Sequence, residues 1–519
     1  MTKLHKHKIG LIPATFIGIS AIIGSGWLFA PYHAAQTAGS ASLLSWIIGA
    51  GLILLLALCF AEIAALFPRR GLTAVISTIS HNKYFGFPFA IANWLGIVAV
   101  IPMEADATIQ YLISLFPSMK SYLWVNDSLA PLGLIFSLVL IVIYCLINYW
   151  GVRSLTKANN AIAIFKIFVP LITAIIVIAV SFHASNFTAV DHNYMPYGWN
   201  SVFTTIITTG IIVAFNGFQS IISFSSEISN PKRNIPLSLV LSIVICLVIY
   251  LLLQVSFIGA LPPSMLKNGW HQLDFQAPMV QLAGLLGLHM IMLILYVDAM
   301  VSPLGTALAY TGSSTRMLTA MSREKQVPRF FDHVHPHYGV SRRSLIFNIA
   351  LAIVFLFSFR SWSSLAQILS LFHILSFMTV PLALVVFRKT VAPKEFTFKI
   401  IGGRLIAALL FIVFSYLFTI GHFSIVFELI LLITIFQAVF IALQSSSLQS
   451  AGCAIKKCGL LFLYFYALTI LCWLSPGHHK LQMSEGNFFI LTAIVAALFF
   501  FALTRTRADA KHEITAPAT

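Results

Sequence analysis

The chain has 519 residues, of which 59% are hydrophobic and only 9% are charged, and its mean hydropathy is +0.93. This composition excludes an ordinary water-soluble globular protein. A net charge of +16 would suggest a nucleic-acid partner in a soluble chain, but the distribution of the basic residues points elsewhere. We therefore expect an all-α polytopic membrane protein, in contact with lipid and without a nucleic-acid partner.

Fourteen mainly apolar stretches recur along the chain, and each can cross a hydrocarbon core of about 30 Å as a helix. They cover residues 9–36, 41–67, 84–116, 130–150, 158–182, 200–228, 236–261, 279–318, 344–360, 364–387, 404–420, 424–444, 458–475 and 485–504. A cleaved signal peptide is the alternative for the first stretch, but its apolar run exceeds the usual length of about 7–15 residues. The connections are too short for a soluble domain, so we expect the function to reside within the membrane.

The basic residues predict the orientation of the chain. Of its 31 Lys and Arg residues, 26 fall on the side of the N-terminus, four on the opposite side, and Lys166 within a span. Cytoplasmic loops carry the excess of Lys and Arg in membrane proteins. The sequence therefore predicts a protein of the cell (inner) membrane with both termini in the cytoplasm.

The first stretch is interrupted in its middle by Gly24-Ser25-Gly26. A broken helix frees backbone groups that cost several kcal/mol each in hydrocarbon unless they are satisfied, so such a break usually lines a binding cavity. Close helix packing by small residues is the alternative interpretation. The sixth stretch has a similar break at Asn216-Gly217, and paired interruptions at corresponding positions favour a transporter site near the midplane.

Four ionisable residues lie deep inside predicted spans: Glu104, Asp106, Lys166 and Asp298. Such residues rarely face lipid and are functional by default. Snorkelling to the inner interface is the alternative for Lys166. The acids can pair with one another through a shared proton or with Lys166, and the residues alone do not decide between these arrangements.

The chain divides into five predicted segments. Residues 1–8 form a basic cytoplasmic N-terminus and 9–390 a core of ten helices. Residues 391–450 hold helices 11 and 12, 451–505 hold additional helices 13 and 14, and 506–519 form a cytoplasmic tail.

Four sequence motifs carry a family resemblance. They are GISAIIGSGW at 18–27, AEIAALFPRRG at 61–71, FNGF at 215–218 running to EISNPKRNIP at 227–236, and RMLTAMSRE at 316–324 with VHPHYG at 334–339. In this order the chain resembles the amino acid–polyamine–organocation permeases. The resemblance implies the leucine-transporter fold, with a 5+5 inverted repeat and alternating access, here with about 14 transmembrane helices.

The resemblance also implies a substrate site at the two breaks. Backbone N–H groups of the first break would bind the substrate α-carboxylate, and the residues are Ile23, Gly24, Ser25 and Gly26. Backbone carbonyls of the second break would bind the α-ammonium group, and these residues are Phe215, Asn216 and Gly217, with the Phe215 ring as a lid.

Proton coupling follows from the same resemblance. Lys166 stands where sodium-coupled relatives hold their second sodium ion, and Thr306 aligns with a serine of that neighbourhood. With Glu104 and Asp298 these residues form the predicted coupling set. We expect no metal, no organic cofactor and no enzyme activity.

The residues from Asn93 to Ala105 are similar to those of bacterial aspartate–proton symporters within the family, which implies an acidic amino acid as substrate. Electrostatics argues the other way, because three buried acids beside one lysine favour a neutral or cationic amino acid. An obligate amino acid exchanger is the alternative within transport, and an amino acid sensor (transceptor) is the alternative from another class. The sequence leaves the oligomeric state open.

Overall fold

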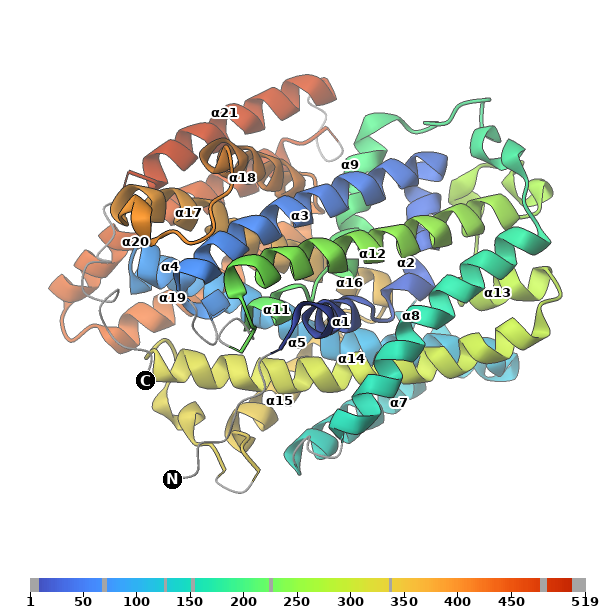
Figure 1. The fold of residues 1–519 in the computed structure, drawn as a ribbon, viewed down its shortest axis with the longest axis horizontal. Helices are drawn as coiled ribbons and strands as arrows, with labels where there is room; N and C mark the ends of the chain where they lie inside the picture. Colours follow the sequence, from blue (N-terminus) through green and yellow to red (C-terminus); the bar gives the residue numbers. More distant parts are fainter. Residues whose placement is uncertain are drawn as a thin grey trace.

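The computed structural model describes residues 9–67, 72–125, 128–150, 155–223, 227–335, 338–476 and 483–505 (Figure 1). Most of these residues are helical, and the two short strands β1 (Trp124–Val125) and β2 (Ser128–Leu129) pair antiparallel. The predicted N-terminal segment 1–8 and the predicted tail 506–519 lie outside the described residues.

Each of the fourteen predicted spans coincides with helical residues. Ten of them correspond to one helix each, namely α3 (Ser42–Leu66), α5 (Lys83–Leu115), α7 (Pro131–Tyr149), α8 (Leu155–Val180), α12 (Pro231–Ala260), α15 (Arg342–Ser358), α18 (Gly403–Thr419), α19 (Phe423–Gln444), α20 (Leu448–Trp473) and α21 (Glu485–Leu503). The other four are divided into α1 (Leu11–Ile22) and α2 (Gly26–Ala38), α9 (Gly198–Thr208), α10 (Ile211–Ala214) and α11 (Gln219–Ser223), α13 (Pro278–Leu285) and α14 (His289–Arg323), and α16 (Trp362–Phe377) and α17 (Thr379–Thr390).

Shorter helices connect these spans. They are η1 (Gly39–Ala41), α4 (Leu72–Ser80), η2 (Pro117–Met119), α6 (Lys120–Leu123), η4 (Ala184–Thr188), η5 (Pro263–Leu266), η6 (Trp270–Gln272), η7 (Arg329–Asp332) and η8 (Pro393–Glu395). Within the described residues, nine helical segments are long and apolar enough to cross a membrane, and three apolar helices of 10–17 residues accompany them. One of the nine segments, Gly26–Leu66, joins α2 to α3, and α1 is one of the three shorter helices. The helices of the broken sixth span are not among the nine.

Helix α5 forms the centre of the molecule. The most apolar part of α5 is 89% buried, and the helix packs along α14 and α16. Helix α12 lies against α1, α3 and α8 on one flank, whereas α18 to α21 pack together on another (Figure 1). The most apolar part of α21 is only 22% buried, so the last helices cover the core from outside rather than forming it.

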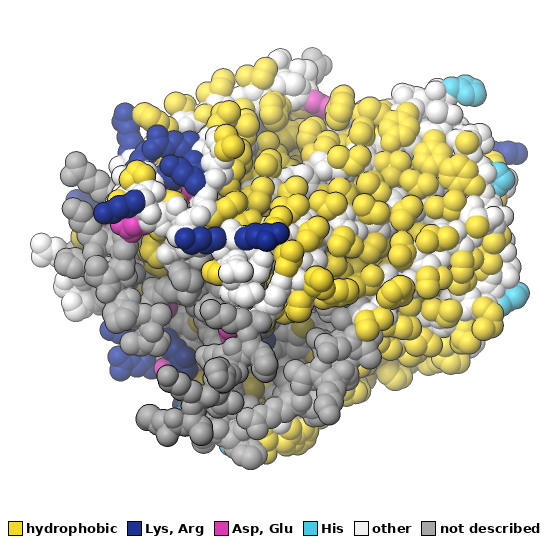
Figure 2. Space-filling view, in the orientation of Figure 1, with side chains coloured by type: hydrophobic (Ala, Val, Ile, Leu, Met, Phe, Trp, Pro, Cys, Tyr) yellow, Lys and Arg dark blue, Asp and Glu magenta, His cyan; other side chains and the backbone are white. Residues whose placement is uncertain are grey.

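Hydrogen bonds place the ends of several helices at one end of the molecule. Lys389 on α17 donates to the Thr504 carbonyl at 3.0 Å, beyond the end of α21. Gln444 at the end of α19 donates to the Lys325 carbonyl at 3.0 Å and accepts from Lys83 at 2.8 Å. Figure 2 shows Lys and Arg side chains gathered mainly toward the left end of the molecule, with a broad hydrophobic surface across its middle. This arrangement suits a protein that spans a membrane.

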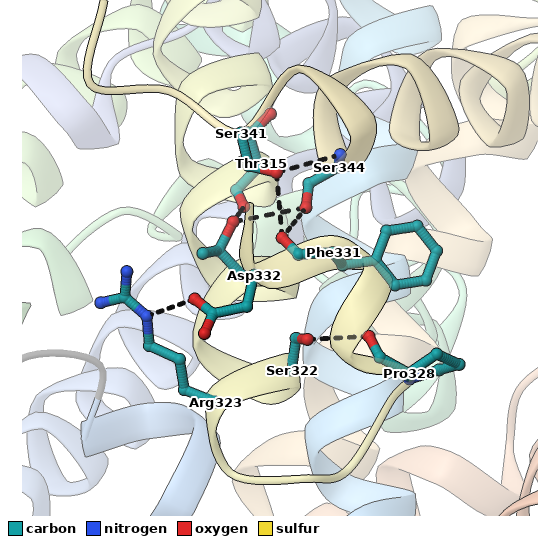
Figure 3. Close-up of polar contacts among 9 residues, drawn as sticks. Thr315, Ser322, Arg323, Pro328, Phe331, Asp332, Ser341 and Ser344 are labelled. Carbon is teal, nitrogen blue, oxygen red and sulfur yellow. Dashed lines mark hydrogen bonds and ion pairs between the residues drawn. The ribbon is translucent and has the colours of Figure 1, made fainter. Parts of the chain in front are cut away.

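The connection between α14 and α15 is held by side-chain hydrogen bonds (Figure 3). Ser322 donates to the Pro328 carbonyl at 2.8 Å, and both Ser341 and Ser344 donate to the Phe331 carbonyl at 2.9 Å. At the surface, Arg323 pairs with Asp332 at 2.6 Å, with side chains 61% and 41% exposed. Residues 324–335 of this connection are therefore tied to the ends of α14 and α15.

A second ion pair is buried and joins α3 to the end of α17. Arg388 Nε and Nη2 donate to the two carboxylate oxygens of Glu62 at 2.7 and 2.6 Å. The Ile400 N–H donates to the same carboxylate at 2.8 Å, and the Glu62 side chain is 0% exposed. The carboxylate is therefore fully desolvated and depends on these donors.

Replacing Glu62 with alanine is expected to lower the free energy of unfolding by about 3–5 kcal/mol, because the Arg388 charge would remain buried without its partner. Thermal unfolding of the detergent-solubilised protein measures this change. The matched control is Asp332→Ala, which breaks the exposed pair and is expected to cost less than about 1 kcal/mol. Equal losses in the two variants would contradict the assignment.

Candidate functional site

The first helix break lies between α1 and α2. Helix α1 ends at Ile22 and α2 begins at Gly26, so the backbone of the intervening residues is not helical. The first N–H groups of α2 have no acceptor within their own helix and carry the positive end of its dipole. The N–H group of Ile23, predicted to bind the substrate carboxylate, is already used within the protein. It donates to the Ile19 carbonyl at 2.9 Å and so completes α1. The N–H groups available for a carboxylate therefore begin after Ile23.

The second break packs directly on the first. Gly217 has a φ of +111°, and a side chain there would collide with the backbone of Ala21 in α1. Its carbonyl accepts from the Ser220 N–H at 2.9 Å. Only glycine combines this backbone conformation with such a close approach. The two interruptions thus meet, as their paired positions in the sequence predict.

A small cavity lies between the two breaks. Its lining comes from both broken spans and from the helices around them, and comprises Ala21, Ile22, Gly24, Gly26, Val100, Met103, Glu104, Gly210, Val213, Ala214, Asn216, Tyr250, Thr306, Tyr310 and Trp362. About 20 Å³ is open to the centre of a water molecule, which is room for one or two waters and too little for an amino acid. The structure is therefore closed around this site.

Trp362 closes one side of the cavity and is a residue that the sequence analysis missed. Its indole N–H donates to the Ser25 hydroxyl at 3.3 Å, and its ring stacks on Phe29 with centroids 4.8 Å apart. The residue is only 1% exposed. An aromatic residue at the start of the tenth span was the available signal. By contrast, the Phe215 ring, predicted as a lid, packs edge-on against Trp46 and Tyr250.

Lys166 reaches the same region from α8. Its ammonium group donates to the Thr306 hydroxyl at 2.7 Å, and the residue is 3% exposed. The side chain packs beside Gly305, since a Cβ at that position would be in ordinary van der Waals contact with Lys166 Cε, 3.6 Å away. The side chain points to α14 and the first break, so it does not reach for the membrane surface as the snorkelling alternative requires.

The buried carboxyl groups of Glu104 and Asp298 interact electrostatically with the ammonium group of Lys166. Glu104 is 1% exposed and lines the cavity beside the first break. Its Oε1 lies 3.0 Å from the position that a Cβ on Gly24 would take. Asp298 accepts a hydrogen bond from Ser302 at 2.7 Å. The structure thus brings the four predicted coupling residues into one cluster beside the first break.

Asp106 is not part of this cluster. It is fully buried, and neither of its carboxyl oxygens has a hydrogen-bond partner among the described residues.

Asn216 lines the cavity, and its side-chain amide is hydrogen-bonded to His373 at 2.8 Å. Within the described part of the chain, no group of three or more His, Cys, Asp or Glu residues is arranged to hold a metal ion.

The sequence also matches a known protein family. Residues 9–446 match the model of the family described as amino acid permease. The chain belongs to the amino acid permease family. This permease is therefore a membrane transporter of small amino acid substrates and not an enzyme, as the sequence motifs predict.

Two bacterial relatives are similar over most of the permease. It is 37% identical to the glutamate/serine transporter AimA of Bacillus subtilis, over 96% of its own length and 94% of that protein. It is 33% identical to the aspartate-proton symporter of the same organism, over 78% and 77% of the two chains.

A mutant of the Eremococcus coleocola manganese transporter is a structural neighbour, with a TM-score of 0.56. It is 14% identical in sequence, and the match covers 97% of both chains. At this identity the likeness concerns the fold alone. The permease has the leucine-transporter fold, and the predicted fold class is confirmed.

Proposed function

We propose that the permease is a proton-coupled symporter of acidic amino acids, aspartate or glutamate, which works by alternating access. The observation that carries the proposal is the contact between Glu104 and the broken segment of α1. Glu104 Oε1 lies 3.0 Å from the position that a Cβ on Gly24 would take, and both residues line the cavity where the substrate α-carboxylate is expected to bind. A carboxyl group of the protein thus lies beside the site proposed for a carboxyl group of the substrate.

This contact provides a physical reason for coupling. An ionised Glu104 repels an incoming carboxylate and competes with it for the N–H groups of the first break. A protonated Glu104 has no charge and does neither. The substrate α-carboxylate and a proton on Glu104 therefore favour each other, which is the linkage that a symporter needs.

Lys166 supplies the counter-charge of this cycle. It is hydrogen-bonded to Thr306 on α14 and faces both Glu104 and Asp298. When the carboxyl groups are ionised, the ammonium group offsets their charge in a medium where an isolated charge is costly. When a proton and an acidic substrate enter together, the charge of the proton balances the net negative charge of the substrate.

The same reasoning removes the electrostatic objection to an acidic substrate. Glu104 and Asp298 repel such a substrate only while they are ionised, and Asp106 lies outside the cluster. The printed names of the two relatives, one for glutamate and serine and one for aspartate with a proton, support this substrate class.

We further propose that residues 9–390 form the transporting core, with Gly24, Ser25, Gly26, Phe215, Asn216 and Gly217 at the substrate. Residues 391–450 and 451–505 would add helices 11 to 14 around it. The excess of Lys and Arg on the side of the N-terminus supports an orientation with both termini in the cytoplasm of a bacterial inner membrane.

The proposal predicts amino acid accumulation driven by a pH gradient. In proteoliposomes that are alkaline inside, labelled aspartate or glutamate is expected to accumulate up to about tenfold per pH unit and per proton carried. A protonophore should collapse this accumulation, and liposomes without protein serve as the control. Counterflow without a gradient measures exchange in the same vesicles. Counterflow together with uptake that ignores the gradient would identify an exchanger and overturn the proton coupling.

A further inference from the structure

The hydrogen bond between His373 and Asn216 links α16 to the second helix break. His373 is 0% exposed, and its Nδ1 lies 2.8 Å from the Leu369 carbonyl. A carbonyl only accepts hydrogen bonds, so Nδ1 carries the proton, and Nε2 of the neutral ring is then an acceptor. Nε2 lies 2.8 Å from Asn216 Nδ2. The ring therefore determines which end of the Asn216 amide faces it, namely the NH₂ group.

This orientation leaves the carboxamide oxygen of Asn216 for another partner. Asn216 Oδ1 is buried and has no hydrogen-bond partner among the described residues. Asn216 lines the cavity together with Gly24 and Gly26 of the first break. A buried acceptor without a donor is costly, and native proteins leave few of them. A ligand with N–H donors in this cavity would satisfy it.

Two glycines, Gly96 and Gly217, leave the space in which His373 and Asn216 lie. A Cβ on Gly96 of α5 would lie 2.9 Å from His373 Cε1, so the ring occupies space that only a glycine leaves open. Gly217, the neighbour of Asn216, rests on the Ala21 backbone. The amide is thus fixed from the side of α5 and α16 and from the side of α1.

We infer that His373 is a positioning residue that directs the Asn216 carboxamide oxygen to the α-ammonium group of the substrate. The inference rests on the proposed amino acid site and extends it, because recognition of the ammonium group there was expected from backbone carbonyls alone. The pair makes the site select amino acids against carboxylates of the same shape that lack the amine. A hydrogen bond to a charged group of this kind changes affinity by about tenfold to a hundredfold.

The test compares two competitors in counterflow, which needs no pH gradient. Uptake of labelled glutamate is inhibited with unlabelled glutamate or with glutarate, which has both carboxylates but no amine. The wild type is expected to favour glutamate over glutarate by at least about tenfold. In His373→Leu this ratio is expected to fall toward one, with a larger change in the apparent KM for glutamate than in the maximal rate.

Further variants separate positioning from a purely structural role. His373→Gln retains an acceptor for the Asn216 NH₂ group and is expected to restore the ratio. Gly96→Ala displaces the ring without removing it and is expected to lower the ratio, which keeps the inference testable should His373→Leu not fold. A wild-type ratio in folded His373→Leu or Gly96→Ala would overturn it. Loss of proton coupling alone would leave this competition unchanged, so the two proposals fail separately.

Discussion

Lys166→Ala is expected to abolish proton-driven accumulation of the substrate while exchange persists. The ammonium group of Lys166 is the basic partner of Glu104 and Asp298 in a buried cluster. Without it, ionised carboxylates in this cluster would be uncompensated, so both groups would hold their protons throughout the cycle. A site that never releases a proton cannot carry one. The accumulation ratio should fall from about tenfold per pH unit to about one.

Gradient-driven uptake and counterflow are measured in the same proteoliposomes. The matched control is Lys83→Ala, which removes an exposed lysine bonded to Gln444 at the end of α19. This control should accumulate substrate as the wild type does. Full proton-driven accumulation by Lys166→Ala would exclude the residue from coupling, whereas retained counterflow shows that the variant is folded.

Glu104→Gln is expected to uncouple substrate binding from the proton. Glutamine is always neutral, so it imitates the protonated acid and does not repel a substrate carboxylate at any pH. Wild-type affinity for the substrate should rise as the external pH falls, because the protonated form of Glu104 admits the carboxylate. In the variant the affinity should not vary with pH, and uptake should continue without accumulation.

Asp106→Asn is the matched control for this experiment. It neutralises a buried acid two residues away on the same helix, whose oxygens have no partner among the described residues. Because Asp106 is not in contact with the coupling cluster, the control should keep its pH dependence. Loss of that dependence in Asp106→Asn, or its survival in Glu104→Gln, would contradict the role assigned to Glu104.

Much of the fold was predictable because the membrane restricts what a chain can do. Apolar stretches of sufficient length must become helices in hydrocarbon, and all fourteen lie on helical residues. Breaks in such helices are rare for the same reason, so Gly24-Ser25-Gly26 and Asn216-Gly217 identified the site region. The motifs added the family and with it the fold.

The contacts within the site were not predictable from periodicity. Lys166 could snorkel or turn inward, and its hydrogen bond to the Thr306 hydroxyl distinguishes the two. A lone histidine in a membrane span is typically structural, and the hydrogen bond to Asn216 is what distinguishes His373. Trp362 gave little signal because one aromatic residue at a helix end is common. The contacts of each of these three residues involve neighbours that are far away in the sequence.

By itself the sequence determined the membrane class, the spans, the two breaks and the family, because hydrophobicity and backbone freedom are local properties of the chain. Only the tertiary structure decided that Glu104 lies on the first break and Asp106 does not, although both stand on α5. Residues two positions apart on a helix point about 200° apart around its axis. The helix that packs against each face, and not the residue type, therefore decides which acid meets the substrate.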